Sequence, residues 1–239
     1  MTVSSVNKLA IAFVALVGGI YYYINYIAYP TFHFHFKLTV EVQTPDGIKS
    51  GSVVNESVFE FQRFGREFGP STSQGLTRGE ALFIDLGKSK NIIVSIGLDE
   101  DRQYNSPPSF EMGVLALALS NPRLWDVKAK DFPERLTEAE KNGPFQFDVR
   151  QLPTLLTLTD PTDYKSMKKI ADPSNLTSSL GAGFEIKKAT VELTHDALSE
   201  KIESELPWLT AFIGKTTGFS GKEQNLESSR RWYKDFKKP

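Results

Sequence analysis

The sequence of 239 residues contains no cysteine and only three histidines. The absence of cysteine excludes disulfide frameworks, metal sites ligated by cysteine, and thiol nucleophiles. The chain also has no large excess of either charge sign, because it contains 28 basic and 29 acidic residues and its formal net charge is −1. Such a chain does not present the clustered positive surface that nucleic-acid binding requires. We therefore expect no nucleic-acid partner.

A recognisable catalytic motif is lacking as well. Gly87-Lys88-Ser89 and Gly214-Lys215-Thr216 resemble the end of a phosphate-binding loop, but the earlier glycine of that loop is replaced by Leu82 and Leu209. Ser71, Ser73 and Ser220 are the candidate serines in glycine-rich stretches, but none of them lies in a G-x-S-x-G nucleophile elbow. The sequence therefore predicts no catalytic residue and no cofactor.

The longest uncharged stretch lies near the amino terminus, from Leu9 to Pro30, and its first part is almost wholly apolar. Residues 9–28 would form a helix of about 30 Å, which matches the hydrocarbon thickness of a bilayer. Tyrosines gather at one end of this stretch, as in the aromatic belt at a membrane interface. The predicted membrane-interface residues are Tyr21, Tyr22, Tyr23, Tyr26 and Tyr29. We expect a single transmembrane helix that contacts the lipid bilayer through residues 9–28.

A cleavable signal peptide is the alternative for this segment. Its apolar region would be shorter and would end in small residues, for which Val17-Gly18-Gly19 is the only passable triplet. Bulky tyrosines follow instead, which favours an uncleaved signal-anchor. The amino terminus and Lys8 precede the helix without an acidic residue, so the positive-inside rule places the amino terminus in the cytoplasm and the main domain outside it.

The pattern of apolar and polar residues over 31–239, the body of the chain, predicts strands more often than helices. Between Thr31 and Gln43 apolar and polar residues alternate, so that Phe34 and Phe36 belong to one buried face. A turn at Pro45-Asp46-Gly47 leads into a returning strand with a bulge at Gly51. Further strands are expected at 80–86, 91–97, 152–158 and 184–194, and residues 65–79 are expected to form a loop.

Three helices are expected in the body, at 110–120, 131–142 and 195–205, with a helical turn or short strand at 166–171. The fold class is mostly antiparallel β, or α+β, behind one amino-terminal transmembrane helix. The predicted organisation is an anchor over residues 1–30, a β-rich extracytoplasmic domain over 31–218 and a mobile basic and aromatic tail over 219–239. Arg230, Arg231 and Lys234 contribute to the basic character of this tail.

Three segments carry a family resemblance. They are Leu38–Gly47 with Ser50-Gly51-Ser52, then Arg78–Leu86, and lastly the stretch from Asp172-Pro173 to Leu206-Pro207-Trp208-Leu209. Together they resemble an uncharacterised proteobacterial family of small proteins with one amino-terminal membrane helix and no assigned activity. The resemblance covers most of residues 36–209. It implies a location in the inner (cytoplasmic) membrane of the bacterial cell envelope, with the domain in the periplasm, and transfers no catalytic residue.

Histidines supply the remaining candidates for chemistry. His33 and His35 are two positions apart on the first predicted strand and therefore point the same way, so that they could hold a transition metal together. His195 could act with a serine and a carboxylate, although a histidine that only opens a helix is the simpler interpretation. The function expected from all these features is a membrane-anchored binding module that faces the periplasm and binds another protein, such as an envelope protein, or another component of the envelope. An envelope hydrolase and a structural spacer are the alternatives.

Overall fold

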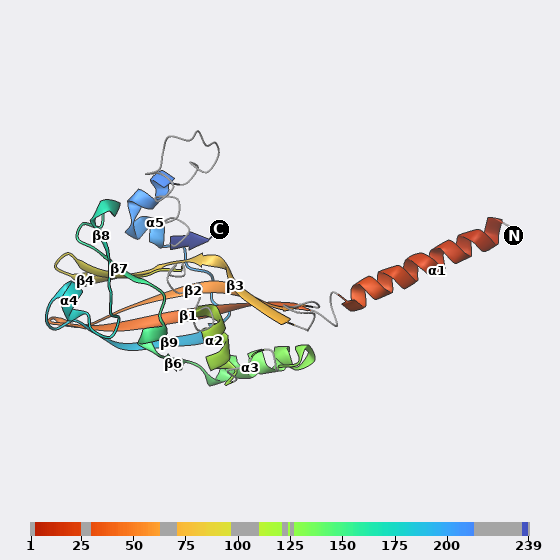
Figure 1. Cartoon of the computed structure of the whole chain (residues 1–239), viewed down its shortest axis with the longest axis horizontal. Coiled ribbons are helices and arrows are strands. Elements are labelled where there is room, and N and C mark those ends of the chain that lie inside the picture. Colours follow the sequence, from red (N-terminus) through yellow and green to blue (C-terminus); the bar gives the residue numbers. More distant parts are fainter. Residues whose placement is uncertain are drawn as a thin grey trace.

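The computed structural model describes residues 3–24, 30–62, 71–96, 110–120, 124, 127–212 and 236–238 (Figure 1). The strands are β1 (Thr31–Thr44), β2 (Gly47–Gln62), β3 (Ser71–Glu80), β4 (Leu82–Gly87), β5 (Lys90–Val94), β6 (Phe145–Phe147), β7 (Leu155–Leu158), β8 (Met167–Lys169), β9 (Glu185–Thr194) and β10 (Lys237–Lys238). The helices are α1 (Val3–Tyr22), α2 (Phe110–Ala118), α3 (Phe132–Asn142), α4 (Thr177–Leu180) and α5 (Ile202–Glu205). Short 3-10 helices are η5 (Ala129–Asp131), η6 (Val149–Gln151), η7 (Tyr164–Ser166) and η8 (Pro207–Phe212).

The strands form two sheets. A six-stranded sheet has the order β10-β3-β2-β1-β9-β6, and a four-stranded sheet has the order β4-β5-β7-β8. Every described pairing in them is antiparallel. The prediction of a mostly antiparallel β fold is therefore confirmed.

The first hairpin follows its predicted alternation closely. Phe36, Leu38, Val40 and Val42 on β1 are buried, whereas Lys37, Thr39 and Glu41 between them are partly exposed. β1 pairs with β2 from Thr31↔Glu60 to Thr44↔Gly47 without a register shift. The predicted bulge at Gly51 is therefore wrong, because Gly51 lies in register opposite Val40.

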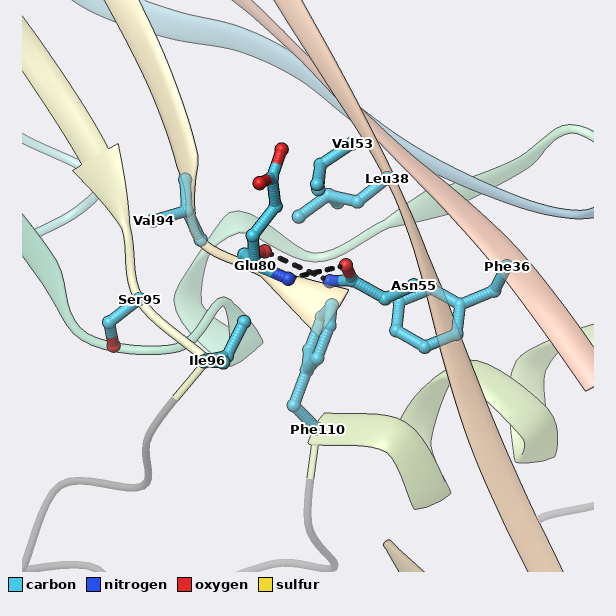
Figure 2. A pocket seen from close by; sticks show the side chains of 9 residues that line it. All are labelled: Phe36, Leu38, Val53, Asn55, Glu80, Val94, Ser95, Ile96 and Phe110. Carbon is cyan, nitrogen blue, oxygen red and sulfur yellow. Dashed lines mark hydrogen bonds between the residues drawn. The ribbon is translucent and has the colours of Figure 1, made fainter. Parts of the chain in front are cut away.

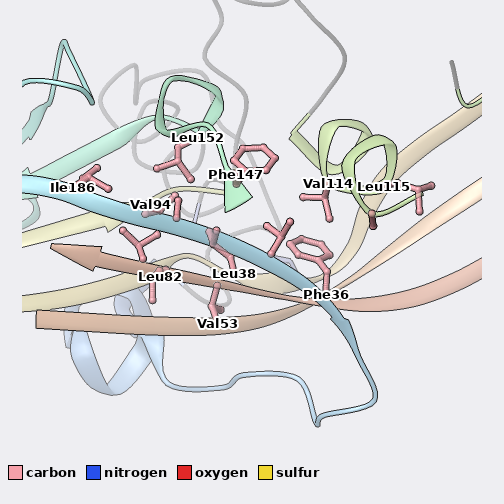
Figure 3. Packing of buried hydrophobic residues seen from close by; sticks show 14 of the residues in the cluster. Phe36, Leu38, Val53, Leu82, Val94, Val114, Leu115, Phe147, Leu152 and Ile186 are labelled. Carbon is pink, nitrogen blue, oxygen red and sulfur yellow. The ribbon is translucent and has the colours of Figure 1, made fainter. Parts of the chain in front are cut away.

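The main core lies between the two sheets and includes one face of α2. Figure 3 shows Phe36 and Leu38 of β1 facing Val94 of β5, with Val114 and Leu115 of α2 beside them. Side chains such as Leu82 and Ile84 on β4 point into this core, while their neighbour Phe83 packs into another apolar cluster. The small sheet is thus apolar on both faces, which explains the nearly continuous apolar sequence of β4.

The second cluster covers the other face of the small sheet. Its buried members are Ala81, Ile93, Leu156, Leu158, Ile202, Leu206, Leu209 and Phe236. These residues come from β5, β7, α5 and η8, from Ala81 before β4, from Leu206 between α5 and η8, and from Phe236. The body is therefore built in three layers, with the small sheet between the large sheet and the α5–η8 segment.

Gly51 marks a close approach between β2 and β4. A Cβ atom at this position would lie 2.9 Å from Cγ1 of Ile84 and 3.1 Å from Cδ1 of Leu82. Gly51→Val is therefore expected to lower the free energy of unfolding by about 1–3 kcal/mol, because added atoms force neighbours out of their packing. The midpoint of urea unfolding measures this change.

Gly113→Ala on α2 is the matched control for this substitution. Its new Cβ atom would meet the Phe147 ring at 3.7 Å, an ordinary contact, and alanine favours a helix over glycine by about 1 kcal/mol. We expect this variant to be as stable as the wild type or more so. Equal midpoints for Gly51→Val and the wild type would contradict the close approach.

Two segments of the body differ from their predictions. Residues 71–80 form β3 and not a loop, because they extend the large sheet along the edge of β2 from Gln62 to Glu56. Residues 195–201 are not helical, and the predicted helix over 195–205 is reduced to α5 at Ile202–Glu205. The other predicted strands and helices of the body that fall on described residues are found within a few residues of their expected positions.

The amino-terminal helix α1 lies to one side of the sheets in Figure 1. No helix in the described parts of the chain combines the length and the apolarity that crossing a membrane requires. This finding differs from the transmembrane helix expected over residues 9–28. The described helix runs from Val3 to Tyr22 and includes polar Ser4 and Ser5, and residues 25–28 of the expected span lie outside the described residues.

The predicted mobile tail is described only at its very end. Phe236 is fully buried, and Lys237 and Lys238 pair with Glu80 and Gly79 as strand β10. Residues 236–238 are therefore packed against the sheets. The basic and aromatic residues between 230 and 235 lie outside the described residues.

Candidate functional site

The outer face of the large sheet carries most of the polar side chains that the sequence singled out. Because side chains alternate along a strand, burial of Phe34, Phe36 and Leu38 turns the side chains of His35 and Lys37 to the opposite face of β1. The two histidines proposed as metal ligands are thus on one face, as predicted. Their partners on this face come from β2, β9 and the segment after β9.

Residues 195–201, which we call the strap, cross this outer face. Asp196 lies over β1, where its backbone oxygen is 2.9 Å from Nδ1 of His35. Ser199 lies at the far edge of β2, where it donates its N–H to the oxygen of Val54 and its Oγ accepts the N–H of Val54. Figure 3 shows the chain leaving β9 and turning back beneath β1 and β2 toward α5.

Lys37 holds the start of the strap to the sheet. Its Nζ lies 3.4 Å from Oε1 of Glu192 on β9 and 3.5 Å from Oδ2 of Asp196. Partial burial acts to lower the pKa of Lys37, but hydrogen bonds and charge from Glu192 and Asp196 outweigh burial and raise that pKa above its ordinary value. The ammonium group therefore remains charged and binds both carboxylates.

Within the described residues, each of the three histidines makes one polar contact. Nδ1 of His33 lies 3.2 Å from Oε1 of Glu56, and Nε2 of His195 lies 3.2 Å from Oε2 of Glu140 on α3. Within the described residues, no group of three or more histidine, aspartate or glutamate side chains is placed to hold a metal ion. Metal binding by His33 and His35 stays a prediction.

Glu80 is the buried acidic residue that sequence reasoning missed. It is 2% exposed and lies at the end of β3, where it lines a small cavity between the sheets with Asn55, Ser95 and Phe110 (Figure 2). The cavity has a volume of about 10 Å³, at the lower limit for one water molecule. An organic substrate does not fit there.

The backbone and the side-chain carboxylate of Glu80 both form hydrogen bonds to other segments. Its backbone N–H donates to Oδ1 of Asn55 at 3.0 Å, and its backbone oxygen accepts from Nδ2 of Asn55 at 3.2 Å. The carboxylate points away from this amide in Figure 2 and accepts the backbone N–H groups of Lys201 at 2.8 Å and Ile202 at 3.1 Å. Glu80 therefore joins β2, β3 and the start of α5, which is a structural role.

Asn91 forms the same kind of junction in the small sheet, in which a side-chain amide bonds both backbone groups of one distant residue. Its Nδ2 donates to the oxygen of Leu158 and its Oδ1 accepts the N–H of Leu158, both at 2.8 Å. The side-chain amide thus continues the β5–β7 pairing beyond the ladder at Ile93↔Leu156. A buried asparagine within an apolar strand is the sequence signal that could have located these two junctions.

The residues proposed for a hydrolase are not brought together. His195 follows β9, whereas Ser71 and Ser73 belong to β3, and β2 and β1 separate those two strands. Since neighbouring strands lie about 4.8 Å apart, β3 and β9 are about 14 Å apart across the sheet. Ser220, the other serine near glycines, lies outside the described residues.

Comparison with known proteins assigns no family. No family model matches the chain, and neither a curated protein nor a solved structure matches it. The features above define the molecule at the level of its class, a two-sheet antiparallel β protein with a separate amino-terminal helix.

Proposed function

We propose that this chain is a membrane-attached binding module of the bacterial envelope that recognises another envelope protein. The observation that carries the proposal is the exposed apolar surface of α1. Its large apolar side chains between residues 9 and 20 are 48% to 70% exposed, and they are Leu9, Ile11, Phe13, Val14, Leu16, Val17 and Ile20. Exposed apolar surface of this extent marks an interaction site.

A lipid bilayer is the occupant that fits this surface. At 100° per residue, the large apolar side chains of α1 spread over more than half of the helix circumference, and alanines and glycines fill the remaining positions. A groove on another protein covers one stripe of a helix, whereas lipid covers a broader apolar surface. The positive charge at Lys8 favours a cytoplasmic amino terminus and a periplasmic domain.

The binding role is favoured over the hydrolase by the separation of His195 from the serines of β3. It is favoured over the spacer by the strap, an irregular segment that Lys37, His35 and Ser199 hold across a sheet face. Irregular segments on a rigid scaffold are where recognition residues are most often found.

Removal of residues 1–30 tests the attachment. We expect the full-length protein to sediment with membranes after a carbonate wash, and the shortened protein, which still begins with the intact β1, to move to the soluble fraction. In the full-length chain, Leu16→Arg is expected to weaken membrane retention, because an arginine at the centre of a membrane helix costs about 3 kcal/mol. Asp46→Arg in the β1–β2 turn adds the same side chain away from α1 and is the control. Continued sedimentation of the shortened protein would contradict the proposal.

Crosslinking in the same membranes tests the binding role. We expect discrete heavier adducts of the full-length protein that contain one defined envelope protein. A structural spacer would give no specific adduct. That outcome would leave membrane attachment in place and remove the binding role.

A further inference from the structure

The last described residues of the chain occupy a socket in the second cluster. Phe236 is fully buried and packs with Ala81, Ile93, Leu206 and Leu209, which are buried residues of β4, β5, α5 and η8 or their flanks. The ring of Trp208 meets the Phe236 ring edge to face, with centroids 5.5 Å apart and planes at 79°. The walls of this socket therefore come from segments far from residue 236 in the sequence.

Trp208 is itself fixed in place by neighbouring segments. Its Nε1 donates to the oxygen of Pro161 at 3.0 Å, and the ring of Tyr164 lies with its centroid 6.0 Å away. The aromatic wall of the socket is thus positioned by contacts that do not involve Phe236. Such a wall can persist when the aromatic side chain that fills the socket is exchanged.

The backbone beside Phe236 pairs with the exposed edge of the large sheet. The oxygen of Phe236 accepts the N–H of Ala81 at 2.7 Å, and Lys237 and Lys238 pair antiparallel with Glu80 and Gly79. Addition of a short strand to a sheet edge, with one side chain in a pocket, is a recurring mode of peptide recognition. Strand pairing supplies affinity in this mode, and the pocket supplies specificity.

We propose that the edge at residues 79–81 and the Phe236 socket form a binding site for an extended peptide with one aromatic side chain. Residues 236–238 occupy this site as an intramolecular ligand. The partner inserts its aromatic ring against Trp208, as Phe236 does, and its backbone oxygen accepts the N–H of Ala81. This inference deepens the proposed binding role by naming the site and the chemistry of the partner.

The intramolecular ligand sets how strongly a partner must bind. A tethered segment acts at an effective concentration of about 1 mM. For a free peptide with a Kd of about 100 μM toward the empty site, competition by the tether raises the apparent Kd about tenfold. Emptying the socket should therefore strengthen binding of the free peptide by the same factor.

The test uses the full chain with Phe236→Ala and a fluorescent peptide of residues 231–239 as the probe. Fluorescence anisotropy is expected to show binding about tenfold tighter to Phe236→Ala than to the wild type, and no binding by a peptide that carries alanine in place of its phenylalanine. Equal binding to both proteins, or no binding to a Phe236→Ala protein that still unfolds cooperatively, would overturn the proposal.

A second measurement keeps the wild-type core intact. A specific protease site inserted after residue 225 lets the folded protein be cut, so that the carboxyl-terminal fragment is held by the socket alone. We expect the fragment to co-elute with the body at high protein concentration and to be displaced by excess peptide of residues 231–239. Immediate loss of the fragment, or its retention despite excess peptide, would refute the site. Neither measurement depends on membrane attachment, so this inference and the proposed function can fail separately.

Discussion

Phe36→Asp is expected to leave the protein unfolded at room temperature. Phe36 is fully buried on β1 and its ring contacts Phe110 with centroids 5.9 Å apart. Loss of a buried phenylalanine costs about 3–5 kcal/mol, and burial of an unpaired carboxylate adds several kcal/mol more. A typical domain is stable by only about 5–15 kcal/mol. Far-UV circular dichroism and urea unfolding measure the result.

Thr39→Asp is the control for this prediction. Thr39 lies on the same strand but on its outer, partly exposed face, where a surface substitution changes stability by about 0.5 kcal/mol. We expect this variant to unfold cooperatively near the wild-type midpoint. If Phe36→Asp behaved in the same way, the assignment of the two faces of β1 would be wrong.

Glu80→Ala is expected to lower the free energy of unfolding by about 2–4 kcal/mol. The substitution removes the acceptor of the Lys201 and Ile202 N–H groups, and a buried donor left without a partner costs about 1–3 kcal/mol. Ile202 is 1% exposed, so water does not replace the lost acceptor there. Thermal unfolding followed by circular dichroism measures this loss.

Two further variants separate the carboxylate from the side-chain volume at this position. Glu80→Gln keeps one oxygen as an acceptor, so about half of the destabilisation is expected. Glu185→Ala on β9 removes an exposed carboxylate that pairs with Lys187, and an exposed pair of this kind contributes at most about 1 kcal/mol. A Glu80→Ala protein as stable as Glu185→Ala would exclude the structural role.

Elements with a strong local pattern were predictable from the sequence. The alternation along β1 and the turn chemistry at Pro45-Asp46-Gly47 predicted the first hairpin, because a half-buried strand repeats its polarity every second residue. α3 was predicted as a short polar helix over residues 131–142 and is found at Phe132–Asn142. These signals act within a few residues of one another.

Elements whose form depends on distant neighbours were not predictable in the same way. β3 has a glycine, serine and threonine sequence typical of a loop, and the exposed edge of β2 makes it a strand. Residues 195–201 have a helical pattern, but contacts with Lys37, Val54 and Glu80 hold them as the strap. Tertiary hydrogen bonds outweigh a local preference of a few tenths of a kcal/mol per residue.

The class of fold, the buried face of β1 and the unusually apolar amino-terminal segment could all be recognised from the order of the residues alone. The site at the end of β3 depends instead on contacts between distant segments. Glu80 contacts residues 201 and 202, Gly51 lies against β4, and Phe236 fills a socket lined by Ala81 and Trp208. The two groups of features differ in the separation along the chain of the residues that produce them. Backbone periodicity and turn geometry are properties of neighbouring residues, whereas packing and buried hydrogen bonds depend on which distant segments the fold brings together.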